Sequence, residues 1–247
     1  MSKSIRSLLL LLCLAGATRA QVTAAVAANL QFAFEEVKTA FQKKTGVETK
    51  AVYGASGKLQ SQIRSGAPFD VFVSADTEWP DSLVKSGDAV GRPRIYAYGR
   101  LVLWTNSGIA LRGLATISDT AVKKVAVGDP KVTVYGPAAI RALEKAGLKD
   151  AATPKFVYGA SITQVAQYVA TGAAQIGFVA KSQMLAGPLS GKGIWVDLPG
   201  VDSIPQAAVL TKYGKDNNPK SAQALLDFLD GPEGRAILGR YGYTFPK

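Results

Sequence analysis

The most constraining feature of this sequence is a regular alternation between segments with strand periodicity and segments with helix periodicity. Residues 22–29 form a short apolar run that predicts a buried strand, and apolar side chains then recur at helical spacing as far as Gly46. Residues 47–53 alternate as a second strand, 57–66 return to helical spacing, and 70–74 form a third apolar run. Strands that alternate with helices in this way predict a parallel sheet with helices on its faces.

The same alternation returns in the middle of the chain. Strands and helices are expected there in turn, over 124–128, 136–146, 155–158, 161–171 and 175–179. This second unit lies between two strongly β-forming stretches, near 99–106 and 204–212, which we expect to cross from one unit to the other.

We therefore expect an α/β fold of two lobes, each a mixed sheet flanked by helices, joined by two crossing strands. The predicted first lobe comprises residues 21–101 together with 206–247, and the second lobe comprises residues 102–205. Because ligands of such sheets bind beyond the carboxyl ends of the strands, a site is expected in the cleft between the lobes. Two independent domains in tandem are the alternative.

The first twenty residues have the pattern of a secretory signal peptide. Lys3 and Arg6 give a basic start, residues 7–15 form a short apolar stretch, and small residues precede a cleavage site after Ala20. The apolar stretch is shorter than the roughly 20 residues that a membrane-spanning helix needs. We therefore predict that residues 1–20 are removed and that the protein is periplasmic, with a retained membrane anchor as the alternative.

The composition excludes several classes of enzyme. The chain has no histidine, and its single cysteine, Cys13, lies in the predicted signal peptide. Ser-His-Asp and Cys-His catalysis, disulfide bonds and the usual structural zinc sites are therefore excluded for the mature chain. An exported enzyme with two facing carboxylates is the remaining enzymatic alternative, but the favoured interpretation is a binding protein without enzymatic activity.

The chain is basic, with a formal net charge of +11. A basic surface raises the rate at which anions encounter a protein. Nucleic acid is not an expected partner, because no run of five basic residues occurs and the aromatic residues are not interleaved with lysine and arginine.

Four of the expected strand-to-helix junctions share one chemical character. They are Ala28–Asn29, Ser56–Gly57, Tyr135–Gly136 and Ser161–Ile162. Each offers backbone N–H groups without an intrahelical acceptor, and most add a neutral hydroxyl or amide. Helix starts of this kind bind anions, because the N–H dipoles favour negative charge. Helix capping alone would also account for Asn29, Ser56 and Ser161.

Eight stretches of the sequence occur in the order seen in one known family. They are residues 26–30, 53–57, 66–76, 99–104, 127–130, 135–136, 172–179, and 231–232 with 241–242. On these stretches the chain resembles the periplasmic molybdate-binding proteins of ABC importers, over essentially all residues that follow the predicted signal peptide. The resemblance implies a two-lobed, type II periplasmic binding protein that closes on its ligand like a hinge. It also implies molybdate or tungstate as the ligand, no cofactor, a membrane permease as the partner, and a monomer.

The resemblance further implies which residues hold the oxyanion. They are Ala28 through its backbone N–H, Asn29, Ser56, Tyr135, and Ile162 through its backbone N–H. Molybdate would be held through its oxygens by these residues, with no direct metal ligand. The chain departs from many relatives in having asparagine at position 29, where they carry serine, and alanine at position 28, where some carry a hydroxyl. One branch places a tyrosine later in the chain, at or near Phe178, which has no donor.

The chemistry of molybdate agrees with this set of groups. As a tetrahedral dianion without a proton it needs donors and no acceptor, so hydrogen phosphate, whose proton would be left unpaired, is disfavoured. Sulfate is equally unprotonated, and only the size of the cavity can exclude it. Another oxyanion such as sulfate is therefore an alternative ligand.

Two further groups of residues raise metal ions as ligands. Two pairs of tyrosines suggest a site for ferric iron: Tyr96 with Tyr98, and Tyr241 with Tyr243. Alternation along a strand, with both rings of a pair on one face, is the simpler explanation. Four neighbouring carboxylates suggest a calcium or magnesium site: Asp70, Asp76, Glu78 and Asp81. They do not match the EF-hand pattern, and roles as helix caps or on the lobe surface are favoured.

Overall fold

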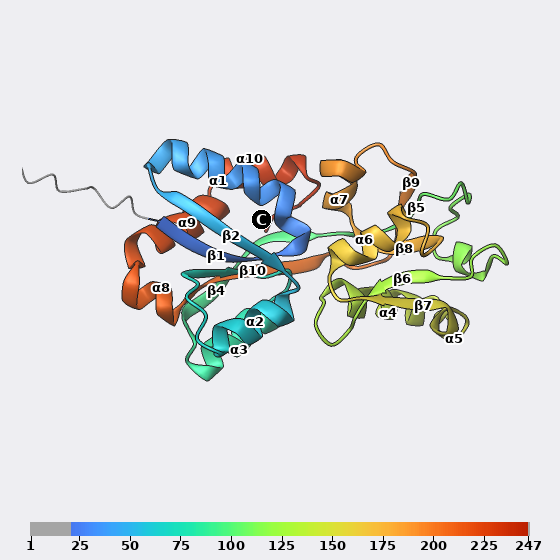
Figure 1. Cartoon of the computed structure of the whole chain (residues 1–247), viewed down its shortest axis with the longest axis horizontal. Coiled ribbons are helices and arrows are strands. Elements are labelled where there is room, and N and C mark those ends of the chain that lie inside the picture. Colours follow the sequence, from blue (N-terminus) through green and yellow to red (C-terminus); the bar gives the residue numbers. More distant parts are fainter. Residues whose placement is uncertain (1–20, 247) are drawn as a thin grey trace, which may run out of the picture.

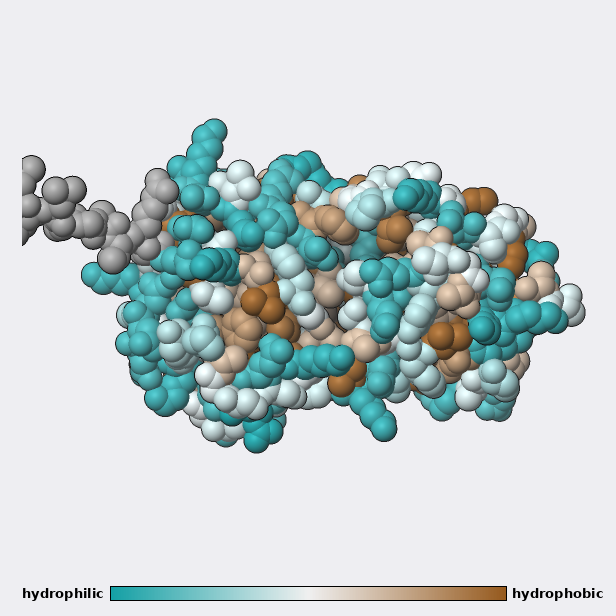
Figure 2. Space-filling model, in the orientation of Figure 1, coloured by the Kyte–Doolittle hydropathy of each residue, from teal (hydrophilic) through white to brown (hydrophobic). Residues whose placement is uncertain are grey.

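Two five-stranded sheets lie side by side along the length of the molecule in the computed structural model, and each is flanked by helices (Figure 1). The structure describes residues 21–246. The predicted signal peptide, residues 1–20, lies outside the described residues. Within residues 21–246 no helix is both long and apolar enough to span a bilayer. The face drawn in Figure 2 is mostly hydrophilic, with apolar side chains in small separate groups.

The first sheet has the strand order β2-β1-β3-β10-β4. Its strands are β1 (Gln21–Ala27), β2 (Glu48–Gly54), β3 (Val71–Val73), β4 (Ala89–Gly99) and β10 (Ile204–Thr211). The first three strands are parallel, and β10 runs antiparallel to both of its neighbours. The sheet is therefore mixed, because β10 returns from the second lobe.

Helices cover both faces of this sheet. One face packs against α1 (Gln31–Thr45), α9 (Pro219–Asp230) and α10 (Pro232–Arg240), and the other packs against α2 (Ser56–Arg64) and α3 (Glu78–Ser86), while α8 (Lys212–Asn217) follows β10. Helix α1 ends at Gly46, whose φ of 74° is the left-handed conformation that glycine adopts at a helix end. The expected stop at Gly46 is confirmed.

The second sheet has the strand order β7-β6-β8-β5-β9. Its strands are β5 (Leu101–Thr105), β6 (Val125–Gly128), β7 (Phe156–Gly159), β8 (Ile176–Ala180) and β9 (Ile194–Asp197). Its helices are α4 (Tyr135–Lys145), α5 (Lys149–Ala152), α6 (Ile162–Ala170) and α7 (Lys181–Leu185). Strand β6 is parallel to β7 and β8, whereas β5 is antiparallel to β8 and β9. The predicted architecture of two mixed, helix-flanked sheets is confirmed.

The chain passes between the sheets in two places. Strand β4 ends at Gly99 in the first sheet and β5 begins at Leu101 in the second, so the expected crossing strand is divided at Arg100. The return crossing precedes Ile204, and β10 belongs wholly to the first sheet. The exact lobe boundaries, residues 21–101 with 206–247 and residues 102–205, stay a prediction.

The pattern missed most of β4 and several short or late elements. Strand β4 contains Gly91 and Pro93 and has no clean alternation of buried residues. It lies at the edge of its sheet, where proline is tolerated because one row of backbone groups is unpaired. Elements such as α3 and α10 were not expected, because each is short and its apolar side chains are few.

Candidate functional site

The four predicted strand-to-helix junctions meet at one small cavity between the two lobes. Its volume is about 20 Å³, and its lining comprises Ala27, Ala28, Asn29, Gly54, Ala55, Ser56, Ala75, Thr133, Val134, Tyr135 and Ile162. All five residues expected to hold an oxyanion belong to this lining. They converge because parallel strands place their carboxyl ends at the same edge of a sheet, and the two sheets turn these edges toward each other.

The first lobe contributes two helix starts to the cavity. Strand β1 leads into a short 3₁₀ helix, η1 (Ala28–Leu30), and β2 leads into α2, whose first residue is Ser56. Neither start has a side chain that caps it. The backbone N–H groups of the first helical residues therefore have no intrahelical acceptor, and that of Gly57 donates instead to the carbonyl of Val132 in the second lobe at 3.1 Å.

Ser56 adds a hydroxyl to this first wall. Its Oγ accepts a hydrogen bond from the backbone N–H of Ala75 at 3.1 Å, and Ser56 is only 3 % exposed. Among the described residues its O–H donates to no protein acceptor. Because the oxygen is already oriented by Ala75, the hydroxyl hydrogen is available to a ligand in the cavity.

The second lobe contributes the starts of α4 and α6. Helix α4 begins at Tyr135, and Thr133 Oγ1 accepts from the N–H of Gly136 at 3.2 Å. Helix α6 begins at Ile162, and Ser161 Oγ accepts from the N–H of Gln164 at 3.2 Å. These two bonds leave the first N–H of each helix, at Tyr135 and Ile162, without an intrahelical partner.

The capping explanation of the three junction residues therefore holds for only one of them. Ser161 is an N-cap, whereas Ser56 is the first residue inside α2 and Asn29 is the second residue of η1. Capping is the wrong explanation for Ser56 and Asn29, because their side chains do not accept from the N–H groups of their own helices.

The electrostatic character of the cavity comes from dipoles and not from charged side chains. None of its lining residues is ionisable at neutral pH. Four helix starts point partial positive charge into one small space, which favours an anion and disfavours a cation. The negative charge of a dianion would therefore be compensated by several backbone N–H groups and not by one charged side chain.

The side chains of Asn29 and Tyr135 are used differently from the expectation. Asn29 Nδ2 shares its two hydrogens among three acceptors: the hydroxyl of Tyr135 at 3.3 Å, Gln206 Oε1 at 3.1 Å and the hydroxyl of Tyr243 at 2.9 Å. Both polar ends are thus turned into a buried network behind the cavity. Their backbone N–H groups, at the helix starts, have no intrahelical acceptor.

Sequence reasoning missed Ser182 and Gln206 as members of that network, and it named Tyr243 only as one of the paired tyrosines. Ser182 Oγ donates to the backbone oxygen of Asn29 at 2.8 Å, and Gln206 Nε2 donates to the hydroxyl of Tyr135 at 3.1 Å. These three residues come from α7, β10 and the C-terminal tail, far along the chain from the junctions. No local pattern connects them with the junctions.

The alternative metal sites find little support in the geometry. Within the described residues no group of three histidine, cysteine or acidic residues is placed to hold a metal ion. Burial raises the pKa of Tyr96 and Tyr243, and their hydroxyls donate to Gln206 Oε1 and to the backbone oxygen of Asn29, respectively. Tyr96 and Tyr98 lie on strand β4 as expected, but Tyr241 and Tyr243 follow α10 outside any strand, so alternation is the wrong explanation for the second pair.

Two of the neighbouring carboxylates have structural partners. Asp70 Oδ2 accepts from the N–H of Thr23 at 2.7 Å, and Asp76 Oδ1 accepts from the hydroxyl of Ser74 at 2.9 Å and from the N–H of Trp79 at 3.3 Å. Burial raises the pKa of Asp76 to about 6, and the nearby charges of Glu78 and Asp81 add to this effect.

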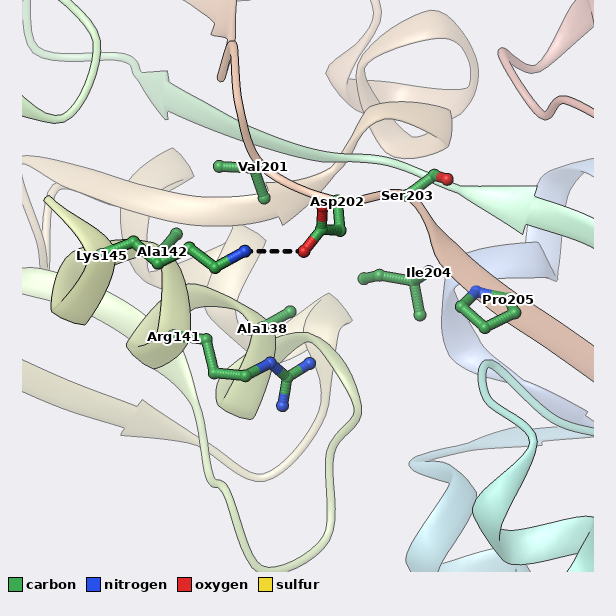
Figure 3. A pocket seen from close by; sticks show the side chains of 9 residues that line it. All are labelled: Ala138, Arg141, Ala142, Lys145, Val201, Asp202, Ser203, Ile204 and Pro205. Atoms are coloured by element: carbon green, nitrogen blue, oxygen red, sulfur yellow. Dashed lines mark hydrogen bonds and ion pairs between the residues drawn. The ribbon is translucent and has the colours of Figure 1, made fainter.

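A second hollow, of about 90 Å³, lies between α4 and the segment before β10 (Figure 3). Lys145 Nζ and Asp202 Oδ2 form an ion pair of 2.8 Å across it, and Arg141 extends along its wall. The four junctions do not reach this hollow. It therefore lacks the convergent N–H groups of the cavity between the lobes.

Known proteins share both this sequence and this architecture. A family model described as bacterial extracellular solute-binding protein matches residues 22–244. The molybdate-binding protein ModA of Azotobacter vinelandii is 42 % identical over 95 % of this chain and 93 % of its own, and ModA of Rhodobacter capsulatus is 40 % identical over 92 % and 90 %. A solved Azotobacter vinelandii periplasmic molybdate-binding protein matches with a TM-score of 0.84 at 30 % identity, over 92 % of this chain and 100 % of that one. This chain therefore belongs to the bacterial extracellular solute-binding protein family, among its molybdate-binding ModA members.

Proposed function

We propose that this protein captures molybdate, or the closely similar tungstate, in the periplasm and delivers it to the membrane permease of an ABC importer. The observation that carries the proposal is the cavity lined by backbone N–H groups from four helix starts and by the hydroxyl of Ser56. A fully deprotonated tetrahedral oxyanion needs only donors, and this cavity supplies donors from both lobes.

The size of the cavity supports a small ligand. Pockets for drug-sized molecules measure about 300–1,000 Å³, whereas this cavity measures about 20 Å³. A sugar, an amino acid or a peptide does not fit such a space. The space favours a ligand of a few atoms, such as a compact ion with hydrogen-bond donors on several sides.

Transport, and not catalysis, is the role that the lining supports. It contains no carboxylate, thiol or lysine that would act as an acid, base or nucleophile. We propose that the protein works as a monomer without a cofactor, and that the oxyanion is its only ligand. The five residues that hold the oxyanion are Ala28, Asn29, Ser56, Tyr135 and Ile162.

Sulfate is the second candidate ligand, because it presents the same charge and the same need for donors. Sulfate is smaller than molybdate, so a rigid cavity shaped for molybdate leaves its donors too distant from the oxygens of sulfate. Hydrogen phosphate carries a proton, and the lining holds no carboxylate to accept it, so its binding is expected to be weaker.

Calorimetric titration of the mature protein with molybdate, tungstate, sulfate, phosphate and ferric citrate tests the proposal. We expect binding of molybdate and tungstate, with a rise in melting temperature, because a ligand that binds only the native state stabilises it by mass action. Sulfate binding as tight as that of molybdate would move the assignment to sulfate. Absence of any thermal shift with molybdate and tungstate at millimolar concentration would contradict the proposal.

A further inference from the structure

Directly behind the anion cavity, six buried polar side chains form one continuous hydrogen-bond network, called here the hinge network. Its members are Asn29, Tyr96, Tyr135, Ser182, Gln206 and Tyr243, and each is at most 5 % exposed. They come from η1, β4, α4, α7, β10 and the tail that follows α10. No charged side chain belongs to the network.

Gln206 lies at one centre of the hinge network. Its Nε2 donates to the hydroxyl of Tyr135 at 3.1 Å, and its Oε1 accepts from Asn29 Nδ2 at 3.1 Å and from the hydroxyl of Tyr96 at 2.9 Å. The side chain is fully buried on the strand that returns from the second lobe. An amide in this position has partners for both of its polar ends.

The backbone oxygen of Asn29 is the other centre. It accepts from Ser182 Oγ at 2.8 Å and from the hydroxyl of Tyr243 at 3.0 Å, and these two hydroxyl oxygens lie 3.2 Å apart. Asn29 is thus held through both its side chain and its main chain. Asn29 also lines the cavity, two residues after Ala27 at the end of β1.

Several bonds of the network join one lobe to the other. Tyr135 and Ser182 belong to helices of the second sheet, whereas Asn29 and Gln206 belong to the first. Opening of the cleft separates these elements, so the bonds from Tyr135 and Ser182 to the first lobe must break. Each bond lost on opening must be replaced by a bond to water at a group that is buried in the closed form, and this exchange opposes opening.

The chain leaves room for this network at a single glycine. A Cβ on Gly99, where β4 ends, would lie 2.1 Å from Gln206 Nε2 and 2.5 Å from the hydroxyl of Tyr135. Gly99 has no positive φ, so backbone conformation does not require glycine there. Glycine is required there because the side chains of Gln206 and Tyr135 approach this position closely.

We propose that the hinge network is a neutral latch: Ser182, Gln206 and Tyr243 are positioning residues that hold Asn29 and Tyr135 in the closed arrangement and thereby set how slowly the bound oxyanion is released. This inference rests on the proposed function for the identity of the ligand. The latch does not titrate near neutral pH, because burial raises the pKa of all three of its tyrosines and they stay hydroxyl donors. The latch opens when the lobes separate, and protonation of its side chains does not open it.

The first test measures dissociation of molybdate by stopped flow in Tyr243→Phe and Ser182→Ala. We expect the dissociation rate constant to rise about 3- to 10-fold in each, as for the loss of one buried hydrogen bond, while the association rate constant stays nearly unchanged. Tyr241→Phe is the matched control, because its hydroxyl bonds to Glu36 within the first lobe. A dissociation rate equal to that of the control in both variants would overturn the inference.

The second test needs no ligand. Spin labels on Lys43→Cys and Lys123→Cys, exposed positions on the two lobes, report the distance between lobes, and the mature chain has no other cysteine. We expect longer distances in Tyr243→Phe and Ser182→Ala than in the labelled parent and in Tyr241→Phe. Unchanged distances would overturn the latch, even if the parent bound neither molybdate nor tungstate and the proposed function had failed. If Tyr243→Phe does not fold, Ser182→Ala carries both tests.

Discussion

The two walls of the anion cavity are built from different kinds of donor. The first-lobe wall combines backbone N–H groups with the hydroxyl of Ser56, which the N–H of Ala75 orients at 3.1 Å. The second-lobe wall offers the backbone N–H groups of Tyr135 and Ile162 at the starts of two helices. A side-chain substitution therefore removes a donor from the first wall, whereas the donors of the second wall depend only on where its helices begin.

The largest effect is expected from Ser56→Ala. Loss of a hydrogen bond to a charged group costs about 1.5–3 kcal/mol, so molybdate affinity falls about 10- to 150-fold. Calorimetric titration measures the change. Ser61→Ala is the control, because Ser61 lies on the same helix and bonds to the carbonyl of Gly57 away from the cavity. Equal affinities in the two variants would contradict the contrast between the walls.

Gly57→Ala tests how closely the walls approach. The N–H of Gly57 donates to the carbonyl of Val132 in the second lobe at 3.1 Å, and an added Cβ would lie 3.1 Å from that backbone and 3.0 Å from the ring of Trp79. We expect affinity to fall about 5- to 10-fold, because overpacking costs at least about 1 kcal/mol. Gly239→Ala, whose Cβ meets nothing closer than 3.7 Å, is the control. Full affinity in Gly57→Ala would show that closure tolerates a wider gap.

The first wall also has a neighbouring carboxyl group, Asp76, that makes the stability of the protein depend on pH. Asp76, beside the first wall, has a folded pKa of about 6 against an ordinary value of 3.8. The folded protein therefore binds more protons than the unfolded chain between these values, and Asp76 lowers stability as pH rises from about 4 to 6. We expect Asp76→Asn to lose this decline in melting temperature, measured without ligand at several pH values. Exposed Asp150→Asn is the control, and parallel profiles for wild type and Asp76→Asn would contradict the prediction.

Ser161→Ala should weaken the second wall indirectly. Loss of the N-cap of α6 lowers the free energy of unfolding by about 0.5–2 kcal/mol, and the first turn that carries the N–H of Ile162 frays. Affinity should fall less than in Ser56→Ala, because no donor is removed. Thr171→Ala, at the far end of the same helix, is the control. Chemical denaturation and titration measure the two quantities, and an effect on affinity above that of Ser56→Ala would reverse the comparison.

The smallest effect is expected from Ile162→Val. The substitution keeps the N–H that faces the cavity and shortens a buried side chain, so unfolding becomes easier by about 0.5–1.5 kcal/mol while molybdate affinity stays unchanged. Denaturation and calorimetry on the same sample separate the two. A loss of affinity as large as that of Ser56→Ala would show that the side chain of Ile162, and not its backbone, shapes the site.

The helix starts could be located from the sequence because local signals mark them. The apolar runs that end near Ala28 and Tyr53, and the helical spacing that follows, place two junctions within one or two residues of η1 and α2. The same holds for the starts of α4 and α6. Periodicity of 2 or 3.6 is a property of neighbouring residues, so it is visible without knowledge of the fold.

The direction of the polar side chains could not be located in this way. The sequence identifies Asn29 as a donor at a junction. It does not show that the amide of Asn29 bonds to the hydroxyls of Tyr135 and Tyr243, which are 106 and 214 residues away. The hydroxyl of Ser56 is oriented by Ala75, 19 residues along the chain. Such long-range contacts depend on how the sheets are ordered, which periodicity does not report.

The sequence by itself therefore determined the alternation of strands and helices, the two-lobed α/β architecture, and the residues that stand at each helix start. These depend on short-range spacing and on the fixed polarity of strand ends. Only the tertiary structure decided that these starts converge on a cavity of about 20 Å³, and that Asn29 and Tyr135 turn their side chains into the hinge network. Convergence and side-chain direction arise from packing between segments far apart in the chain, where a buried polar group takes whichever partner the fold brings within reach.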